Sequence, residues 1–270
     1  MRLWVLGSSS AGNAVLLESG ETRVLVDAGF HPRTLAARLH AIGVPPGSIA
    51  AALITHEHGD HVRGACAGAR RWGWALYATR GTIAAVPELA AAGAQPIGTA
   101  RPVAVGDLAL HAMPTSHDAA EPVGVVATDT RTGARAGIAY DLGRADAGVH
   151  RALQDLELLV LEANHDPQML RAGPYPRSVQ ARIASARGHL SNAAAASLAC
   201  ACAGRTLAHL VLAHLSVRCN DPHVATHTVG SALARTAFRG ALHTAPPQRP
   251  IGPFLARRAA PAATQLALAL

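Results

Sequence analysis

The chain has 270 residues, half of them hydrophobic and only 3% aromatic, and its net charge of +7 comes from arginine because there is no lysine. This length allows one large α/β domain or two small ones, with a core built mainly from aliphatic side chains. The N-terminal apolar run is too short for a signal peptide, and no apolar stretch approaches the roughly 20 residues of a membrane span, so we expect a cytoplasmic protein without a membrane segment.

Short β-type runs separated by Gly, Pro or Asn recur along the chain. Strands are expected at residues 3–6, 14–18, 22–29, 51–55, 108–113, 123–129, 134–140, 156–163 and 209–216, and helices at about 32–41, 60–72, 82–92 and 192–203. Strands dominate the early part and helices follow, which indicates a layered α/β protein rather than a strict βαβ repeat. After about residue 240 the sequence is rich in Pro, Ala and Arg with weak periodicity, so we divide the chain into a domain at 1–240 and an extended or frayed tail at 241–270.

The loop Gly7–Asn13, "GSSSAGN", joins the first two expected strands. It is either a polar hairpin turn or a turn that contacts substrate, in which Ser9, Ser10 or Asn13 donates a hydrogen bond to phosphate. The sequence alone favours neither interpretation.

The stretch "THEHGDH" follows the expected strand at 51–55 and contains four metal-ligand side chains within six residues. In an extended segment, side chains two apart point the same way, so His56 and His58 can bind one ion together. Gly59 permits a sharp turn, after which Asp60 and His61 open a helix and face a second ion. The spacing therefore indicates two metals rather than one crowded site.

Two metals need further ligands, and three candidates each follow a buried apolar strand and precede a turn: His117, Asp141 and His214. A carboxylate is the natural bridge between two cations, so Asp141 is the expected bridging ligand. Asp118, beside His117, is a weaker candidate that we interpret as a hydrogen-bonding turn residue.

This ligand order resembles the metallo-β-lactamase fold superfamily over roughly residues 1–220. The resemblance implies a four-layer αββα sandwich, with Asp27 of "VLVDAG" supporting the ligand loop without binding metal. It implies one ion held by His56, His58, His117 and Asp141, and another held by Asp60, His61, Asp141 and His214; these sets are the predicted ligands. Two such ions, about 3.5–4 Å apart and holding a hydroxide between them, hydrolyse esters or phosphodiesters.

Within the superfamily, Glu162, His189 and His214 follow an order similar to the extra motifs of ribonuclease Z and the β-CASP nucleases. The segments "GSSSAGN", "THEHGDH", "SHDAAEPVG", "LEANHD", "GPYPRSVQARIASARGHLSN" and "HLS" together resemble the YycJ/WalJ family. That resemblance implies a dinuclear metal-dependent phosphodiesterase, specifically a 5′ exonuclease on DNA, in which Glu162 and His189 form a catalytic pair. Asp60 is assigned a catalytic role besides its role as a ligand.

A physical argument supports a phosphodiester substrate. His189 precedes an expected helix whose free N–H groups and dipole favour phosphate, and Ser191 or Asn192 can cap that helix. Glu162 can hold the imidazole of His189 in one tautomer. Residues 167–220 contain six arginines and no acid, and Arg177 and Arg187 lead into the site. The candidate substrate-binding residues are therefore Arg177, Arg187 and Ser191, together with Ser9, Ser10 and Asn13.

Two other function classes stay open. A dinuclear hydrolase of a small acyl substrate, such as a lactone or thioester, needs neither the Glu162–His189 pair nor the arginine run. A metal-stabilised binding module would not need a full ligand set. The ligand types suit Zn²⁺, Mn²⁺ or Fe²⁺, and metal identity, DNA or RNA as substrate, cleavage polarity and oligomeric state are left open.

Overall fold

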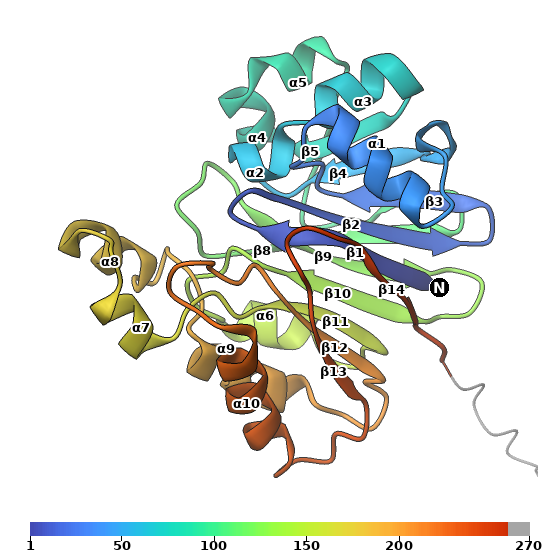
Figure 1. Cartoon of the computed structure of the whole chain (residues 1–270). Coiled ribbons are helices and arrows are strands. Elements are labelled where there is room, and N and C mark those ends of the chain that lie inside the picture. The colour runs from blue at the N-terminus through green and yellow to red at the C-terminus, as the bar shows by residue number, and fades with distance from the viewer. Residues whose placement is uncertain (259–270) are drawn as a thin grey trace, which may run out of the picture.

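Two seven-stranded sheets face one another, and helices cover their outer faces, in the computed structural model, which describes residues 1–258 (Figure 1). The first sheet has the order β14-β1-β2-β3-β4-β5-β6 and the second β13-β12-β11-β10-β9-β8-β7. The strands of the first sheet are β1 (Arg2–Ser9), β2 (Gly12–Ser19), β3 (Thr22–Val26), β4 (Ala51–Ile54), β5 (Ala75–Thr79), β6 (Gln95–Ile97) and β14 (Ile251–Leu255). Those of the second are β7 (Val103–Val105), β8 (Leu108–Pro114), β9 (Val123–Asp129), β10 (Arg135–Ala139), β11 (Leu158–Glu162), β12 (His209–Ala213) and β13 (Ala241–Thr244).

The strands are apolar on both faces because each sheet is covered on both sides. In β1, Leu3 and Val5 belong to the core between the sheets, whereas Trp4 and Leu6 belong to the core beneath the helices of the first sheet. A third core joins the second sheet to its own helices. The expected four-layer αββα sandwich is confirmed.

The helices fall into two groups, one on each outer face, with a pair projecting from the side (Figure 1). The first sheet carries α1 (Pro32–Ala41), α2 (Gly59–Val62), α3 (Ala65–Trp72), α4 (Arg80–Ala85) and α5 (Pro87–Ala91), with a 3-10 turn at Pro46–Ser48. The second carries α6 (Ala147–Ala152), α9 (Asn192–Cys202) and α10 (Pro222–Leu233), while α7 (Pro167–Ala172) and α8 (Arg177–Ile183) form the projection. Among residues 1–258, no helix is both long and apolar enough to cross a membrane.

Two expected helices are each broken in two. The helix expected at 60–72 divides at Gly64. This residue packs against the segment that contains Phe30, and a Cβ added to Gly64 would lie 2.6 Å from the carbonyl oxygen of Phe30. The helix expected at 82–92 divides at Val86, because the following Pro87 disfavours the helical conformation in the residue before it and begins α5.

The sheets also continue past residue 240, which corrects the expected domain boundary. β13 pairs with β12 in parallel and β14 pairs with β1 in antiparallel orientation. Phe254 and Ala256 are buried in the core between the sheets. These short edge strands lack a clear alternating pattern, so the sequence alone did not reveal them. Of the expected tail, residues 259–270 lie outside the described part of the chain.

Candidate metal centre

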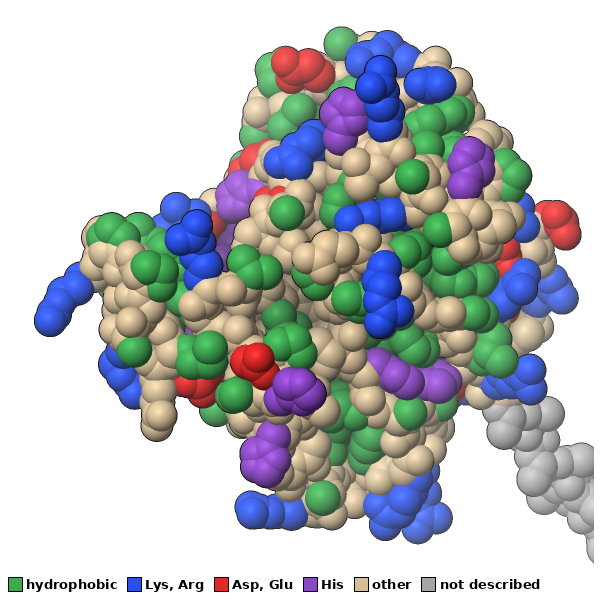
Figure 2. Space-filling view, viewed as in Figure 1, with side chains coloured by type: hydrophobic (Ala, Val, Ile, Leu, Met, Phe, Trp, Pro, Cys, Tyr) green, Lys and Arg blue, Asp and Glu red, His purple; other side chains and the backbone are tan. Residues whose placement is uncertain are grey.

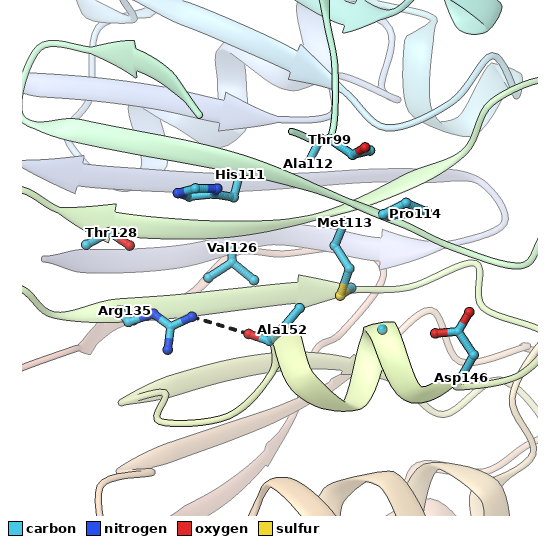
Figure 3. A pocket seen from close by; sticks show the side chains of 11 residues that line it. Thr99, His111, Ala112, Met113, Pro114, Val126, Thr128, Arg135, Asp146 and Ala152 are labelled. Carbon is cyan, nitrogen blue, oxygen red and sulfur yellow. Dashed lines mark hydrogen bonds between the residues drawn. The ribbon is translucent and has the colours of Figure 1, made fainter. Parts of the chain in front are cut away.

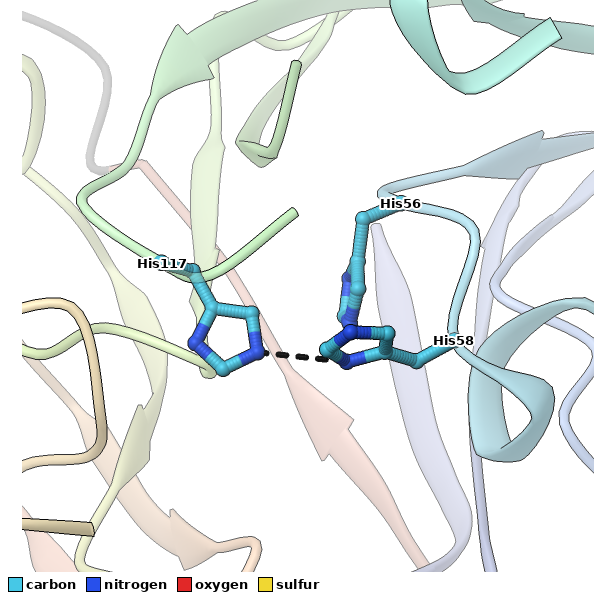
Figure 4. A group of neighbouring side chains, drawn as sticks. All are labelled: His56, His58 and His117. Atoms are coloured by element: carbon cyan, nitrogen blue, oxygen red, sulfur yellow. Dashed lines mark hydrogen bonds between the residues drawn. The ribbon is translucent and has the colours of Figure 1, made fainter. Parts of the chain in front are cut away.

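The predicted ligands meet at the carboxyl ends of β4, β10 and β12, together with the loop after β8. His56 and His58 lie between the end of β4 and the start of α2, and His117 follows β8. One imidazole nitrogen from each of these three histidines lies within 4.8 Å of the other two. Figure 4 shows the rings converging, with His58 Nδ1 3.3 Å from His117 Nε2.

A second cluster lies beside the first and consists of Asp60, His61 and His214. Oδ2 of Asp60 lies 3.4 Å from Nε2 of His61 and 3.5 Å from Nε2 of His214. Asp60 and His61 are in the first turn of α2, so the turn at Gly59 separates them from His56 and His58. The loop therefore contributes His56 and His58 to one cluster and Asp60 and His61 to the other, and His56 and His61 also lie together beside Asp141.

Asp141 lies between the two clusters. Its Oδ2 is 2.8 Å from His61 Nε2 and 4.0 Å from His56 Nε2, and its Oδ1 is 3.8 Å from His117 Nε2. One carboxylate therefore reaches ligands of both clusters, which is the geometry that a bridging ligand requires.

The Nδ1 atoms of four histidines are held by neighbours, which leaves each Nε2 for an ion. His61 Nδ1 lies 2.7 Å from Asp27 Oδ2 and His214 Nδ1 lies 3.0 Å from Glu162 Oε1. His117 Nδ1 lies 3.0 Å from the carbonyl oxygen of Gly188. His56 Nδ1 lies 3.0 Å from the hydroxyl of Thr55. Such outer partners fix the tautomer and orientation of metal-binding histidines.

Several buried atoms in the centre have no hydrogen-bond partner among the described residues. They include Nε2 of His56, Nε2 of His214 and Oδ2 of Asp141, whose 2.8 Å contact with His61 Nε2 does not have the geometry of a hydrogen bond. A buried polar group left unpaired costs about 1–3 kcal/mol, so three of them in one place indicate a missing partner. Divalent cations would satisfy all three, and the mixed imidazole and carboxylate set suits Zn²⁺, Mn²⁺ or Fe²⁺. The residues present therefore fit metal ions.

The electrostatics of the centre also suit cations. Burial lowers the pKa of His56 and of His117, which favours the neutral imidazole that binds metal. Burial alone would raise the pKa of Asp141, but His214 and His61 hold it well below its usual range. The carboxylate is thus ionised beside the two histidine clusters.

Asp27 lies beneath the ligand loop and holds it in place. Its carboxylate accepts hydrogen bonds from the amide and hydroxyl of Thr55, at 2.8 and 2.9 Å, and from the hydroxyl of Tyr140 at 2.7 Å. Asp27 also contacts His61, so it has three partner residues, and its side chain is fully buried. This placement agrees with a supporting role.

Three non-glycine residues of the centre adopt positive φ angles: Asp27 at 62°, Asp141 at 53° and His214 at 54°. Such backbone conformations cost about 1–3 kcal/mol each and persist where the surrounding structure imposes them. Two of the three are proposed ligands and the third supports the ligand loop. The strain is therefore concentrated at the functional site.

Glu162 and His189 form a pair at the edge of the metal clusters. Nδ1 of His189 lies 2.8 Å from Oε1 of Glu162 and 3.3 Å from Oδ1 of Asp141. Oε2 of Glu162 accepts the amides of Leu142 and Leu190 at 2.9 and 3.0 Å. Burial opposes the charged imidazole, but Glu162 and Asp141 raise the pKa of His189 to about 11. The His189 side chain keeps 20% of its surface exposed, so its ring can contact a bound substrate.

Two of the three predicted residues of the first loop are buried, and one of them contacts proposed metal ligands. Asn13 Nδ2 lies 3.3 Å from Asp60 Oδ2 and 3.2 Å from His61 Nε2. Ser9 is buried, and its hydroxyl accepts the amide of Ala11. Ser8 was not predicted, yet its hydroxyl donates to Asn13 and accepts the amide of His214 at 2.8 Å. Of the three loop candidates for substrate contact, Ser10 alone is exposed.

The remaining candidates lie outside the two histidine clusters. Ser191 caps α9 by accepting the amide of Ala194 at 3.2 Å. Arg187 Nε donates a hydrogen bond to the backbone carbonyl of the predicted ligand His117 at 3.2 Å, and this contact helps to hold the His117 loop in position. Arg177 is exposed at the start of α8. Asp118 pairs with Arg182 at 2.7 Å.

A cavity of about 390 Å³ lies elsewhere, on the outer side of the second sheet between β8, β9 and α6 (Figure 3). Arg135 spans its edge and donates to the carbonyl of Ala152. No predicted ligand and no member of the Glu162–His189 pair lines it, so it is separate from the metal centre.

Comparison with known proteins agrees with this geometry. Residues 9–139 match the family model described as the metallo-beta-lactamase superfamily. The chain is 30% identical to exodeoxyribonuclease YycJ of Bacillus anthracis over 242 residues, which cover 87% of this chain and 89% of that protein. It is 30% identical to exodeoxyribonuclease WalJ of Streptococcus pneumoniae over 238 residues, covering 86% and 87% of the two chains. The crystal structure of the metallo-beta-lactamase fold protein YhfI from Bacillus subtilis superposes with a TM-score of 0.70 at 18% identity, over 93% of this chain and 98% of that one.

Proposed function

Because the chain belongs to the metallo-β-lactamase superfamily and, within it, to the YycJ/WalJ family, we propose that this metal-dependent hydrolase is a dinuclear phosphodiesterase, specifically a 5′ exonuclease acting on DNA. The observation that carries the proposal is the Glu162–His189 pair beside Asp141. The pair supports the proposal because it holds an imidazole beside the proposed metal ligands, where its second nitrogen can donate a hydrogen bond to a phosphate group.

The proposed ligand sets are those predicted from the sequence. His56, His58 and His117 would hold one ion, Asp60, His61 and His214 would hold the other, and Asp141 would contact both. When bound, such a pair of ions activates water near neutral pH and neutralises charge on the phosphate oxygens. The histidines and carboxylates hold their ligand atoms in position through the partners of each Nδ1.

His189 acts on the substrate in this proposal. Its Nδ1 is occupied by Glu162, so Nε2 is the atom that can donate to a non-bridging phosphate oxygen or to the leaving oxygen. His189 lies two residues before Ser191, which is the N-cap of the 11-residue α9. The helix dipole favours negative charge at this end of α9. An imidazole held in this way can donate a hydrogen bond to an oxygen on which negative charge builds up as the phosphodiester is cleaved.

The proposal is tested by comparing substrates with the metal-loaded protein. Bis(4-nitrophenyl) phosphate and 5′- or 3′-labelled DNA strands should be cleaved, with mononucleotides released from the 5′ end, while a panel of lactones and thioesters should react far more slowly. Cleavage of RNA in preference to DNA would correct the substrate. Turnover of lactones or thioesters without turnover of phosphodiesters would overturn the proposal in favour of an acyl hydrolase.

A further inference from the structure

A cavity of about 530 Å³ opens between the α7–α8 projection and the loop that follows β11. Its wall combines apolar side chains such as Leu170 with four polar ones, His165, Arg171, Arg177 and Gln180. The volume lies in the range that small-molecule sites occupy. It is larger than a phosphate group needs and suits a phosphate together with its sugar.

The cavity is connected to the Glu162–His189 pair through His165, and neither member of the pair lines it. His165 follows β11 by three residues, and its carbonyl accepts the amide of Asn192 at 2.9 Å, while its backbone pairs with Ser191 in an isolated β-bridge. It is therefore next to the segment that carries His189. Burial lowers the pKa of His165, and the charges of Glu162 and His189 act on it in opposite directions.

His165 itself has no assigned partner. It is only 3% exposed, and among the described residues its Nδ1 forms no hydrogen bond although that atom is buried. The adjacent carboxylate of Asp166 is already used, since its Oδ1 caps α7 by accepting the amides of Gln168 and Met169. A buried imidazole that lines a cavity without a partner points to a ligand in that cavity.

Two guanidinium groups give this cavity its charge. Arg171 and Arg177 are exposed, and within residues 1–258 neither guanidinium forms a hydrogen bond or an ion pair. Arginine side chains are prominent over the α7–α8 projection, at the left of Figure 2. No acidic residue lines the cavity. Arginine binds phosphate oxygens in a bidentate manner, so an anion is the expected ligand.

We propose that this cavity binds a second phosphate of the nucleic-acid strand, with its sugar, next to the phosphate that is cleaved. His165, Arg171 and Arg177 contact the phosphate, and Leu170 packs against the sugar. This inference rests on the proposed nuclease function and adds to it a subsite that selects polynucleotides over simple phosphodiesters.

The test compares a trinucleotide, which has a second phosphate, with bis(4-nitrophenyl) phosphate, which has the scissile phosphate alone. In the double variant Arg171→Gln, Arg177→Gln, kcat/KM for the trinucleotide should fall about tenfold or more, mainly through KM, because the variant cannot form the charge-assisted hydrogen bonds to the second phosphate. The fall for the dye ester should be several-fold smaller. The log–log salt dependence of single-strand binding should flatten by about 0.7 for each phosphate that an arginine no longer neutralises.

Arg33→Gln is the matched control, because Arg33 is also exposed but lies on α1, over the other sheet. It should leave the ratio of the two substrates as in the wild type. His165→Gln should change the ratio in the same direction as the arginine variant, and the exposed arginines keep the test valid should that buried substitution impair folding. Equal losses on both substrates, or none, would overturn the subsite while leaving the nuclease function intact. A wild-type protein that cleaves neither phosphodiester would overturn the function and the subsite together.

Discussion

Oε1 of Glu162 lies 3.0 Å from Nδ1 of His214. The same oxygen also contacts Nδ1 of His189, so one buried carboxylate serves a proposed metal ligand and a proposed catalytic residue. Glu162 therefore contacts residues of both the proposed metal centre and the proposed catalytic pair. The sequence analysis had suggested only that Glu162 pairs with the proposed catalytic residue His189.

Glu162→Gln tests this double role. Glutamine has one carbonyl oxygen, which can accept either from the two imidazole N–H groups or from the backbone amides of Leu142 and Leu190. One of these two sets of partners is therefore lost, and the orientation of both rings should be lost in part. We expect activity and metal affinity each to fall about 10–100-fold, the usual effect of removing an outer partner of a metal ligand. Metal titration with a competing chelator measures the affinity. An unchanged affinity with reduced activity would limit Glu162 to the support of His189.

His189→Ala should separate catalysis from metal binding. His189 is partly exposed and is not among the proposed ligands, so the variant should keep its metal content and fold. The rate of phosphodiester cleavage should fall about 10²–10⁴-fold, the usual contribution of a positioned acid. His40→Ala is the control, because His40 is exposed on α1. Loss of a metal from the His189 variant would show that it is a ligand, and full activity would contradict the proposed reaction.

Asp141→Asn should lower the metal content below two ions per chain. An amide carries no charge and bridges two cations poorly, so at least one ion should bind much more weakly. Metal analysis of gently purified protein measures this, and Asp107→Asn, at an aspartate paired with Arg131 and distant from the ligands, is the control. Two full equivalents in the Asp141 variant would be incompatible with the bridging role.

The ligands could be predicted from the sequence because each follows a buried strand, and the carboxyl ends of neighbouring parallel strands meet at one edge. The contact between Glu162 and His214 could not be predicted from the sequence. It depends on β11 and β12 pairing in a register that sets Glu162 opposite Ala213, the residue before His214. Sheet register between strands about 50 residues apart is not encoded in local pattern.

The projecting helices α7 and α8 and the last strands β13 and β14 could not be predicted from the sequence either. α8 has no buried residue, and Val179 and Ile183 are its only large apolar side chains at helical spacing, which is too short a pattern to indicate a helix. The hydroxyl of Tyr140, which follows β10, donates to Asp27, which follows β3 in the other sheet. Each of these features depends on tertiary contacts that local periodicity does not record.

Tyr140→Phe should destabilise the metal-free protein. The variant removes one hydrogen bond to a buried carboxylate and leaves Asp27 with its other partners, so the free energy of unfolding should fall by about 2 kcal/mol. Denaturant titration of chelator-treated protein measures it. Tyr77→Phe is the matched control, because the Tyr77 hydroxyl forms no hydrogen bond among the described residues. Equal stabilities of the two variants would contradict the supporting role of Tyr140.

Truncation after Gly240 should abolish folding, whereas truncation after Arg258 should not. The longer cut removes β13 and β14, exposes the edges of β12 and β1, and takes Phe254 and Ala256 out of the core between the sheets. Burial of a large apolar side chain contributes about 1.5–3 kcal/mol, and the unpaired strand edges would favour aggregation. The shorter cut retains both strands and their pairing. Circular dichroism and size-exclusion chromatography of the two proteins measure the difference. A folded, monodisperse protein ending at Gly240 would show that the last two strands are dispensable and would restore the boundary first expected from the sequence.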